Sequence, residues 1–352
     1  MKDPSGKGGI YVLTYADDHK EPVSVERITI DEWPKDLDFH PLGLDIIPGP
    51  TGEPSTLFVV NHDRVATSVE KIEIDPKTLR AGKRLMSTYP RSNLTPEPYL
   101  ITLLSVFTKH LYHPMLWAGN SVVALSPTSI LVSNDHFFTM RGPSPWKHFV
   151  PMVESMMLLP LGTVVHLEFT TGELHASTVA KGIPFANGLA LSPDRKEVAV
   201  VACSSASVRL YSLEENGGVS LKYKTAVKMP FSADNIDYTH DGRLIVAGHP
   251  YFPGLVKFSQ GKADNAPSWV VEIANRTLTG VTKGEDDKQS PYPITKRASS
   301  HADYSVQTMF MSDGSLFPSS STGLWDPEAG KLFATGLYAD GILVCTKAQG
   351  KM

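Results

Sequence analysis

Cysteine is scarce in this sequence, with only Cys203 and Cys345 in 352 residues. Two cysteines make neither a disulfide framework nor a cysteine-based zinc site. The sequence also lacks an apolar run of the roughly 18–20 residues that a membrane-spanning helix needs. Its first residues, MKDPSGKGG, have no apolar core and so do not form a signal peptide. The sequence is therefore not that of a disulfide-rich or cysteine-zinc protein, nor that of a protein with a membrane-spanning helix. It leaves the cellular location unknown.

Charge of one sign is not concentrated anywhere along the chain. The 33 Lys and Arg residues and 37 Asp and Glu residues are mixed, and the net charge is -4. No basic patch favours nucleic-acid binding. The G-x-S-x-G elbow of serine hydrolases is absent as well, which disfavours a serine nucleophile. Turn formers are abundant, with 27 Gly and 27 Pro, as folds with many short strands require.

One pattern recurs five times along the chain. Each copy has a small or amide residue, a short alternating strand, a turn rich in Pro, Asp, Gly or Ser, and a second apolar strand. The copies span residues 43–62, 120–136, 187–203, 235–250 and, more weakly, 321–337. Asn187 and Asn235 are 48 residues apart, close to the period of about 40–50 residues of a four-stranded propeller blade. The pattern predicts an all-β fold, a single β-propeller domain over residues 1–352.

Helix signals are weak outside this pattern. One short helix is expected near residues 155–159. Residues 262–306 are polar and rich in turn formers, and we expect an exposed loop at KGEDDKQSPYP, residues 283–293.

Polar residues occupy matching places in the repeats. Asn120, Asn187 and Asn235 hold the same place in three copies, and Asp234 precedes Asn235 in the stretch ADNIDYTHDGRL. Equivalent ends of the inner strands of a propeller point at its central channel. Carboxylate and amide oxygens that meet there suit calcium, which accepts both kinds of ligand. The alternative for each residue alone is a local turn at a strand end.

Five blocks of the sequence resemble the serum paraoxonase/arylesterase family. They are FANGLALSPDRKEVAVVAC, ADNIDYTHDGRLIVAGHP, LFVVNHDRVATSVEKIEI, ILVSNDHFF and KLFATGLYADGILVC. The resemblance implies a six-bladed β-propeller with calcium in its channel, the first blade being incomplete here. It also implies hydrolysis of lactones, aryl esters and some organophosphates, with the metal polarising the carbonyl group and a histidine pair activating water.

The resemblance assigns roles to individual residues. It implies calcium ligands at Asn120, Asn187, Asp234 and Asn235, which is the set that the repeats indicate. His62, in VVNHD, matches the second histidine of the catalytic pair. The blocks FANG and GHP put Phe185 and His249 at the wall of the substrate pocket. We rank His62 first as general base, His249 second and Asp234 third.

The sequence departs from the family pattern in several places. Leu42, in FHPLG, stands where the first catalytic histidine is expected, and we count it as a pocket residue. Ser121 replaces an acidic ligand of the second calcium ion, so we expect one calcium site and not two. No Glu-Asp pair and no cysteine matches those near the N-terminus of the family, which leaves Cys345 unpaired. We expect either an N-terminally truncated chain or a divergent member.

Three functions are compatible with this sequence. The first is a calcium-dependent hydrolase of aryl esters or lactones, with a small-molecule substrate. The second is a propeller similar to gluconolactonases or strictosidine synthases. The third is a propeller that has lost catalysis and acts as a binding module, which Leu42 favours. Because Asp234 is the one carboxylate of the expected site, we expect weak calcium binding, with a Kd of about 10⁻⁴–10⁻³ M.

Overall fold

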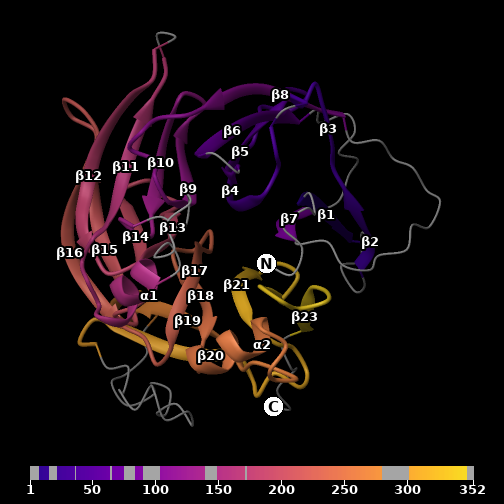
Figure 1. The fold of residues 1–352 in the computed structure, drawn as a ribbon, viewed down its shortest axis with the longest axis vertical. Helices are drawn as coiled ribbons and strands as arrows, with labels where there is room; N and C mark the ends of the chain where they lie inside the picture. The colour runs from indigo at the N-terminus through magenta and orange to yellow at the C-terminus, as the bar shows by residue number, and fades with distance from the viewer. Residues whose placement is uncertain are drawn as a thin grey trace. The chain divides into compact units, whose positions relative to one another are not determined.

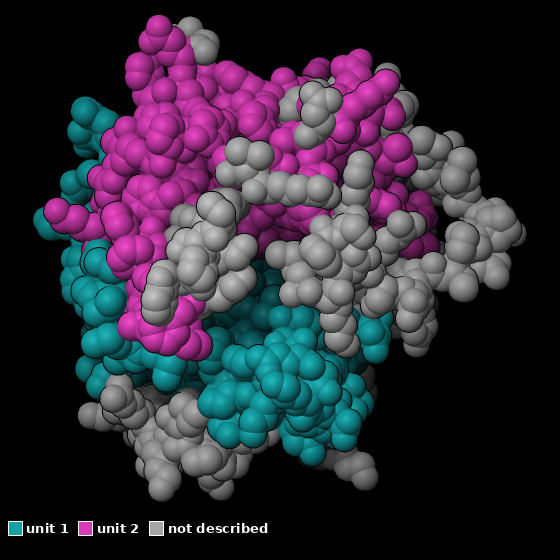
Figure 2. All heavy atoms as spheres, viewed as in Figure 1, with its two compact units in different colours: residues 1–2, 155–161, 182–352 teal, residues 3–154, 162–181 magenta. Residues whose placement is uncertain are grey.

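The computed structural model describes residues 8–15, 22–35, 37–63, 66–74, 84–89, 104–138, 149–170, 173–279 and 301–346. The chain divides into two compact units, coloured teal and magenta in Figure 2. Unit 1 comprises residues 1–2, 155–161 and 182–352, and unit 2 comprises residues 3–154 and 162–181. The single domain expected over residues 1–352 stays a prediction.

The chain is an all-β propeller, as predicted, and its sheets are built mainly from consecutive antiparallel strands (Figure 1). The described residues form 23 strands in six sheets, together with three short helices. Only three of these sheets have the four strands of a complete blade. The number of six blades therefore stays a prediction.

Unit 2 holds three sheets, apart from the last two residues of β12. A three-stranded sheet has the order β2 (Pro22–Arg27), β1 (Gly9–Tyr15), β7 (Arg84–Tyr89). A five-stranded sheet has the order β3 (Thr29–Asp31), β8 (Leu104–Leu111), β6 (Thr67–Ile74), β5 (Ser55–His62), β4 (Pro41–Ile47). A four-stranded sheet has the order β12 (His175–Ile183), β11 (Gly162–Glu168), β10 (Ser129–Asn134), β9 (Gly119–Ser126).

Unit 1 holds the other three sheets, and their strands follow chain order. The first comprises β13 (Ala186–Leu191), β14 (Glu197–Ala202), β15 (Ser207–Glu214) and β16 (Ser220–Lys228). The second comprises β17 (Ser232–Tyr238), β18 (Leu244–His249), β19 (Ser268–Asn275) and β20 (Tyr304–Ser312). The third comprises β21 (Ser320–Asp326), β22 (Lys331–Gly336) and β23 (Leu343–Thr346).

The five predicted repeats are five antiparallel hairpins. They correspond to the strand pairs β4–β5, β9–β10, β13–β14, β17–β18 and β21–β22. The second strand of each pair is almost wholly buried, and all six residues of β18 and of β22 are. Burial of both faces of a strand explains why these segments are continuous apolar runs. In unit 1 the core around them includes the Phe231 and Trp269 rings, 5.5 Å apart.

The short helix expected near residues 155–159 is present, but it begins and ends earlier in the chain. The helix expected at 155–159 is α1, Phe149–Met156, and it ends before Leu158, whose φ of 56° is left-handed. The polar, turn-rich segment 262–306 contains β19 and the first residues of β20, and Trp269 on β19 is only 2% exposed. The loop expected at residues 283–293 lies outside the described residues.

Two further helices are short. Helix α2 spans Phe252–Ser259, and α3 spans Arg276–Thr279. Among the described residues, no helix has the length and apolar character needed to cross a membrane.

Candidate functional site

The candidate ligands lie at β-bulges near the start of the first strand of their hairpins. In β9, Asn120 and Ser121 together oppose the single residue Ser133 of β10. In β13, Asn187 and Gly188 form the same irregularity. Such a bulge turns side chains away from the regular alternation of a strand and is frequent next to active sites.

The hairpin β17–β18 shows that the sequence register was wrong by one residue. Asp234 and Asn235 form the bulge between the paired residues Ala233 and Ile236. Asp234 is therefore the structural counterpart of Asn120 and Asn187, and Asn235 is the counterpart of Ser121 and Gly188. An extra residue in a strand shifts the alternation, so simple alignment of the amides misplaced the carboxylate.

The first strands of the two remaining hairpins, β4 and β21, also carry irregularities. In β4, Leu42 and Gly43 lie between the paired residues Pro41 and Leu44. In β21, the irregularity falls between Ser320 and Thr322. Leu42 thus occupies in β4 the bulge position that a polar residue fills in β9, β13 and β17.

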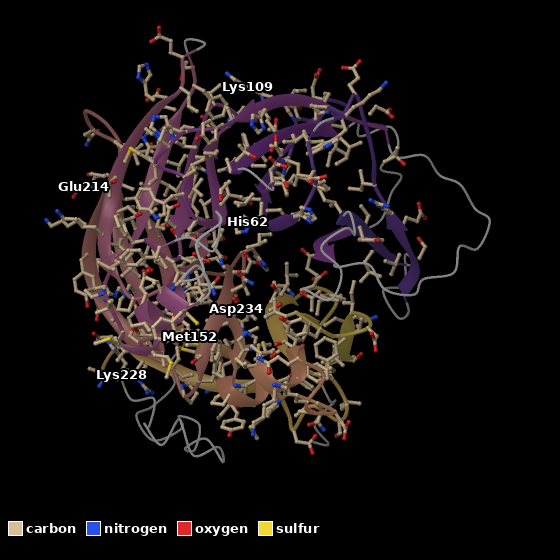
Figure 3. All side chains as sticks on the ribbon, in the orientation of Figure 1. His62, Lys109, Met152, Glu214, Lys228 and Asp234 are labelled. Atoms are coloured by element: carbon tan, nitrogen blue, oxygen red, sulfur yellow. The ribbon has the colours of Figure 1, made fainter. Side chains whose placement is uncertain are left out.

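Asp234, which Figure 3 labels, is the centre of a buried polar cluster in unit 1. Asn187 Nδ2 donates to Asp234 Oδ1 at 2.6 Å, and His249 Nε2 lies 3.1 Å from Asp234 Oδ2. Both oxygens of this carboxylate are therefore hydrogen-bonded, as a buried charge requires. The His249 side chain is 4% exposed, and its other ring nitrogen, Nδ1, has no hydrogen-bond partner among the described residues.

The side-chain NH₂ group of each candidate asparagine donates a hydrogen bond. Asn187 Nδ2 donates to Asp234, Asn235 Nδ2 donates to Thr322 Oγ1 at 3.1 Å, and Asn120 Nδ2 donates to Asp135 Oδ2 at 3.1 Å. An amide held in this way can direct its oxygen to another group.

Two glycines allow the bulged strands to approach each other closely. In unit 1, a Cβ on Gly188 would lie 2.7 Å from Asn235 Cα and 2.9 Å from Asp234 O. In unit 2, a Cβ on Gly43 would lie 2.6 Å from Asn120 O and from Ser121 Cα. Any side chain at either glycine would push the neighbouring bulge away. Sequence reasoning did not identify these residues, although a Gly-Leu pair follows the first bulge position in both copies.

His62 lies at the end of β5, next to the candidate ligand strand β9. Its Nε2 is 2.5 Å from the carbonyl oxygen of Gly119, the residue before Asn120. A carbonyl only accepts hydrogen bonds, so Nε2 carries a proton and Nδ1 is the nitrogen that can take one up. His62 and Asn120 thus lie close together in unit 2.

The expected pocket residues have distinct surroundings. Leu42 is half-buried and packs on a core cluster of unit 2 that includes Phe58 and Val122. Phe185 directly precedes β13 and has φ of 58°, which is strained for an aromatic residue. Strain of this kind is frequent at functional sites. In unit 1, the ring of His249 lies 6.5 Å from that of Phe252, which is 41% exposed.

The Asp234 cluster has the ligand chemistry of a calcium site. In the described part of the chain, no group of three or more His, Cys, Asp and Glu side chains could hold a metal ion. A metal site here must therefore use amide oxygens, which calcium accepts and softer metals disfavour. Asp234 supplies one carboxylate, and the amides near it have NH₂ groups that already donate hydrogen bonds, so their oxygens can bind an ion. This combination fits calcium.

A comparison with protein families matches this part of the chain. The arylesterase family model matches residues 104–282, which is just over half of the sequence. The matched segment contains the bulges of β9, β13 and β17 and also His249. Leu42 and His62 lie outside it.

Curated relatives are serum paraoxonases. Serum paraoxonase/arylesterase 2 of Canis lupus familiaris is 24% identical over 248 residues, 70% of this chain and 58% of that protein. The protein of the same name from Gallus gallus is 28% identical over 222 residues, 62% of this chain and 51% of that protein. This chain thus spans little more than half the length of these relatives.

Solved structures are similar only at low identity. A luciferin-regenerating enzyme is 13% identical with a TM-score of 0.41, and covers 97% of this chain and 96% of its own. A gluconolactonase from Xanthomonas campestris is 11% identical with a TM-score of 0.37, and covers 97% of this chain and 98% of its own.

Proposed function

Because the chain belongs to the arylesterase family, as a divergent paraoxonase-like member, we propose that it hydrolyses small aryl esters or lactones in a calcium-dependent reaction. The observation that carries this proposal is the buried Asp234 carboxylate in its bulge, held by Asn187 on one side and His249 on the other. Burial of a carboxylate costs free energy even when an amide and a histidine hold it, so a functional role would explain why Asp234 is kept there.

Asn187, Asp234 and Asn235 hold the calcium ion in this proposal. Asn120 is the fourth ligand, and its assignment rests on the sequence resemblance. When bound, calcium supplies a Lewis acid that polarises the carbonyl group of the substrate. The proposal includes one calcium site and no second one.

His62 is the general base of the proposed reaction. The Gly119 carbonyl fixes the proton on Nε2, and so Nδ1 takes the proton from the attacking water. The water oxygen bonds to the carbonyl carbon, the bond from that carbon to the leaving oxygen breaks, and the proton passes from His62 to the leaving oxygen. His249 is the second candidate for this role. The sequence resemblance alone counts Leu42, Phe185 and His249 as residues of the substrate pocket.

The test is the initial rate of hydrolysis of phenyl acetate, a γ-lactone and a δ-lactone. Each is measured with millimolar calcium, with excess chelator, and with calcium restored. We expect the rate to fall by about 10²-fold or more with chelator and to recover with calcium, since removal of a group that stabilises the transition-state charge costs about 10²–10³-fold.

Variants assign the effect to the proposed site. Asp234→Ala should remove the calcium-dependent rate, whereas Asp264→Asn, which changes an exposed aspartate of unit 1, should keep it. An undiminished rate in chelator, or full activity of Asp234→Ala, would overturn the proposed metal site.

Leu42 supports a second candidate, a propeller that binds such esters without hydrolysing them. Leu42 lies at the bulge of β4, and its aliphatic side chain cannot transfer a proton. In that case lactone binding measured by calorimetry would depend on calcium while no product forms in the hydrolysis assay.

A further inference from the structure

His249 has a buried ring nitrogen that makes no hydrogen bond among the described residues. Its Nε2 lies 3.1 Å from Asp234 Oδ2, whereas its Nδ1 is buried and has no partner there. The side chain is only 4% exposed, and both residues belong to unit 1. Buried polar groups almost always have a hydrogen-bond partner, so this nitrogen is an exception that the fold alone does not explain.

The contact with Asp234 determines which kind of partner suits Nδ1. A carboxylate accepts hydrogen bonds and has none to donate, so Nε2 carries the proton of the neutral imidazole. Nδ1 then has a lone pair and is a hydrogen-bond acceptor. A buried acceptor without a donor costs free energy, and a ligand that brings an O–H group to it removes this cost.

An exposed aromatic residue lies next to His249. Helix α2 begins at Phe252, three residues after His249, and the backbone N–H of Gly254 donates to Tyr251 O at 3.0 Å. The Phe252 ring lies 6.5 Å from the His249 ring, and Phe252 is 41% exposed. The apolar part of a ligand can therefore pack on Phe252 while a polar group of the same ligand approaches His249.

We propose that His249 Nδ1 accepts a hydrogen bond from a hydroxyl group of the substrate, so that the site selects esters or lactones with a hydroxyl group next to the carbonyl group. The inference rests on the proposed function, because it names the substrate class of that same site. In that function the carbonyl group binds at the calcium ion that Asp234 holds. Only the width of the imidazole ring and one hydrogen bond separate Nδ1 from the Asp234 carboxylate, so the hydroxyl group belongs on the carbon beside the carbonyl carbon.

The selection comes from the acceptor that a wrong substrate leaves unpaired. Sites that hydrogen-bond a hydroxyl group of the substrate reject analogues that lack it, because the polar group of the protein then has no partner. We expect a preference of about 10-fold or more in affinity for the hydroxyl-bearing ligand.

The test compares two ligands that differ only in this hydroxyl group. They are N-methylpyrrolidone and its analogue with a hydroxyl group on the carbon next to the carbonyl carbon. Both lactams present a carbonyl group and resist hydrolysis, so a difference in chemical reactivity does not affect the comparison, and neither has an N–H group. Their affinities for the wild type are measured in millimolar calcium by ligand-observed NMR titration.

Two replacements of His249 separate the roles of its two nitrogens. In His249→Gln, the new NH₂ group can stand where Nε2 does and donate to Asp234, but no acceptor stands at the place of Nδ1. In His249→Asn, the shorter amide reaches the place of Nδ1 and not that of Nε2. We expect His249→Gln to bind the two lactams equally and His249→Asn to keep a preference for the hydroxy lactam.

His240→Gln is the matched control, because it makes the same change at an exposed position of unit 1. It should keep the full preference of the wild type. Far-UV circular dichroism and the urea midpoint establish that each variant is folded, and the comparison of the two lactams on the wild type needs no variant.

A preference that is lost in His249→Gln and kept in His240→Gln would support the inference. Equal affinity of the wild type for the two lactams, no binding of either, or an undiminished preference in His249→Gln would overturn it. If the inference is overturned while phenyl acetate is hydrolysed in a calcium-dependent reaction, the proposed function stands. If the preference is found but no ester or lactone is hydrolysed, the proposed function fails, and His249 still marks a binding site for hydroxyl-bearing carbonyl compounds.

Discussion

At the scale of single residues, the most completely buried charge described lies outside the proposed ligand set. Glu70, on β6, is 0% exposed and accepts hydrogen bonds from Ser68 Oγ at 2.6 Å and from Asn61 Nδ2 at 3.2 Å. His110 Nδ1, from β8, lies 3.0 Å from its carboxylate. Asn61 also donates to Asp38 O and accepts from His40 N, so this cluster connects β5 and β6 to the segment before β4.

The pair Glu70–His110 should make stability depend on pH. The hydrogen bond and charge of Glu70, with a smaller contribution from Asp63, raise the pKa of His110 despite partial burial. A raised folded-state pKa means that the stabilisation is complete below the ordinary histidine pKa of about 6.5 and is lost as the pH rises through the raised value. His110→Gln should therefore lower the free energy of unfolding more at about pH 5.5 than at about pH 8.5. Urea unfolding at the two pH values measures this difference.

A matched control for that experiment is His240→Gln, in the turn between β17 and β18. His240 is exposed and has no ion pair among the described residues. Its replacement should change stability by a similar small amount at both pH values. Equal losses for His110→Gln at low and high pH would show that the Glu70–His110 pair does not carry the charge effect.

At the scale of secondary-structure elements, Gly188 tests the approach of β13 to β17. In Gly188→Ala, the new Cβ would lie within 3.0 Å of Asn235 Cα and Asp234 O, so one strand must move. We expect the free energy of unfolding to fall by about 1–3 kcal/mol, the usual cost of overpacking. Calcium affinity should fall as well, because the 2.6 Å contact of Asn187 with Asp234 joins these strands. Urea unfolding and calorimetric titration measure the two effects.

Gly341→Ala provides the comparison for this change. No atom lies within 4 Å of a Cβ at Gly341, and its φ is not positive. Alanine at such a site leaves stability unchanged or raises it slightly, because it restricts the unfolded chain. If Gly188→Ala were as stable as Gly341→Ala, the close approach of the two strands would not constrain the site.

The elements also show what the sequence could predict. The five hairpins were predictable because apolar strands, turn residues and spacing repeat together, and each signal is local. The bulges were not predictable, because an extra residue in a strand is defined only by its partner strand. This is why Asn235 was aligned with Asn187 although Asp234 is the structural counterpart.

Elements outside the repeats were predicted less well. Strand β19 begins in a segment rich in Ser, Pro and charge, and its apolar core of Trp269, Val270 and Val271 is short. Packing of Trp269 on Phe231 decides that this segment is a buried strand. Among the candidate residues, Asn187, Asp234 and His249 are in contact in unit 1, and His62 lies next to Asn120 in unit 2.

At the scale of the whole molecule, the proposed calcium ion should stabilise the fold. A ligand that binds the folded state alone adds RT ln(1 + [L]/Kd) to the free energy of unfolding. With a Kd of about 10⁻⁴–10⁻³ M, about 10 mM calcium adds about 1.4–2.7 kcal/mol. Urea unfolding with and without calcium measures this gain. Magnesium at the same concentration should add much less, because it favours a near-ideal octahedral site and dehydrates reluctantly. The gain should be absent in Asp234→Ala, and an equal gain in that variant would mean that the ion binds elsewhere.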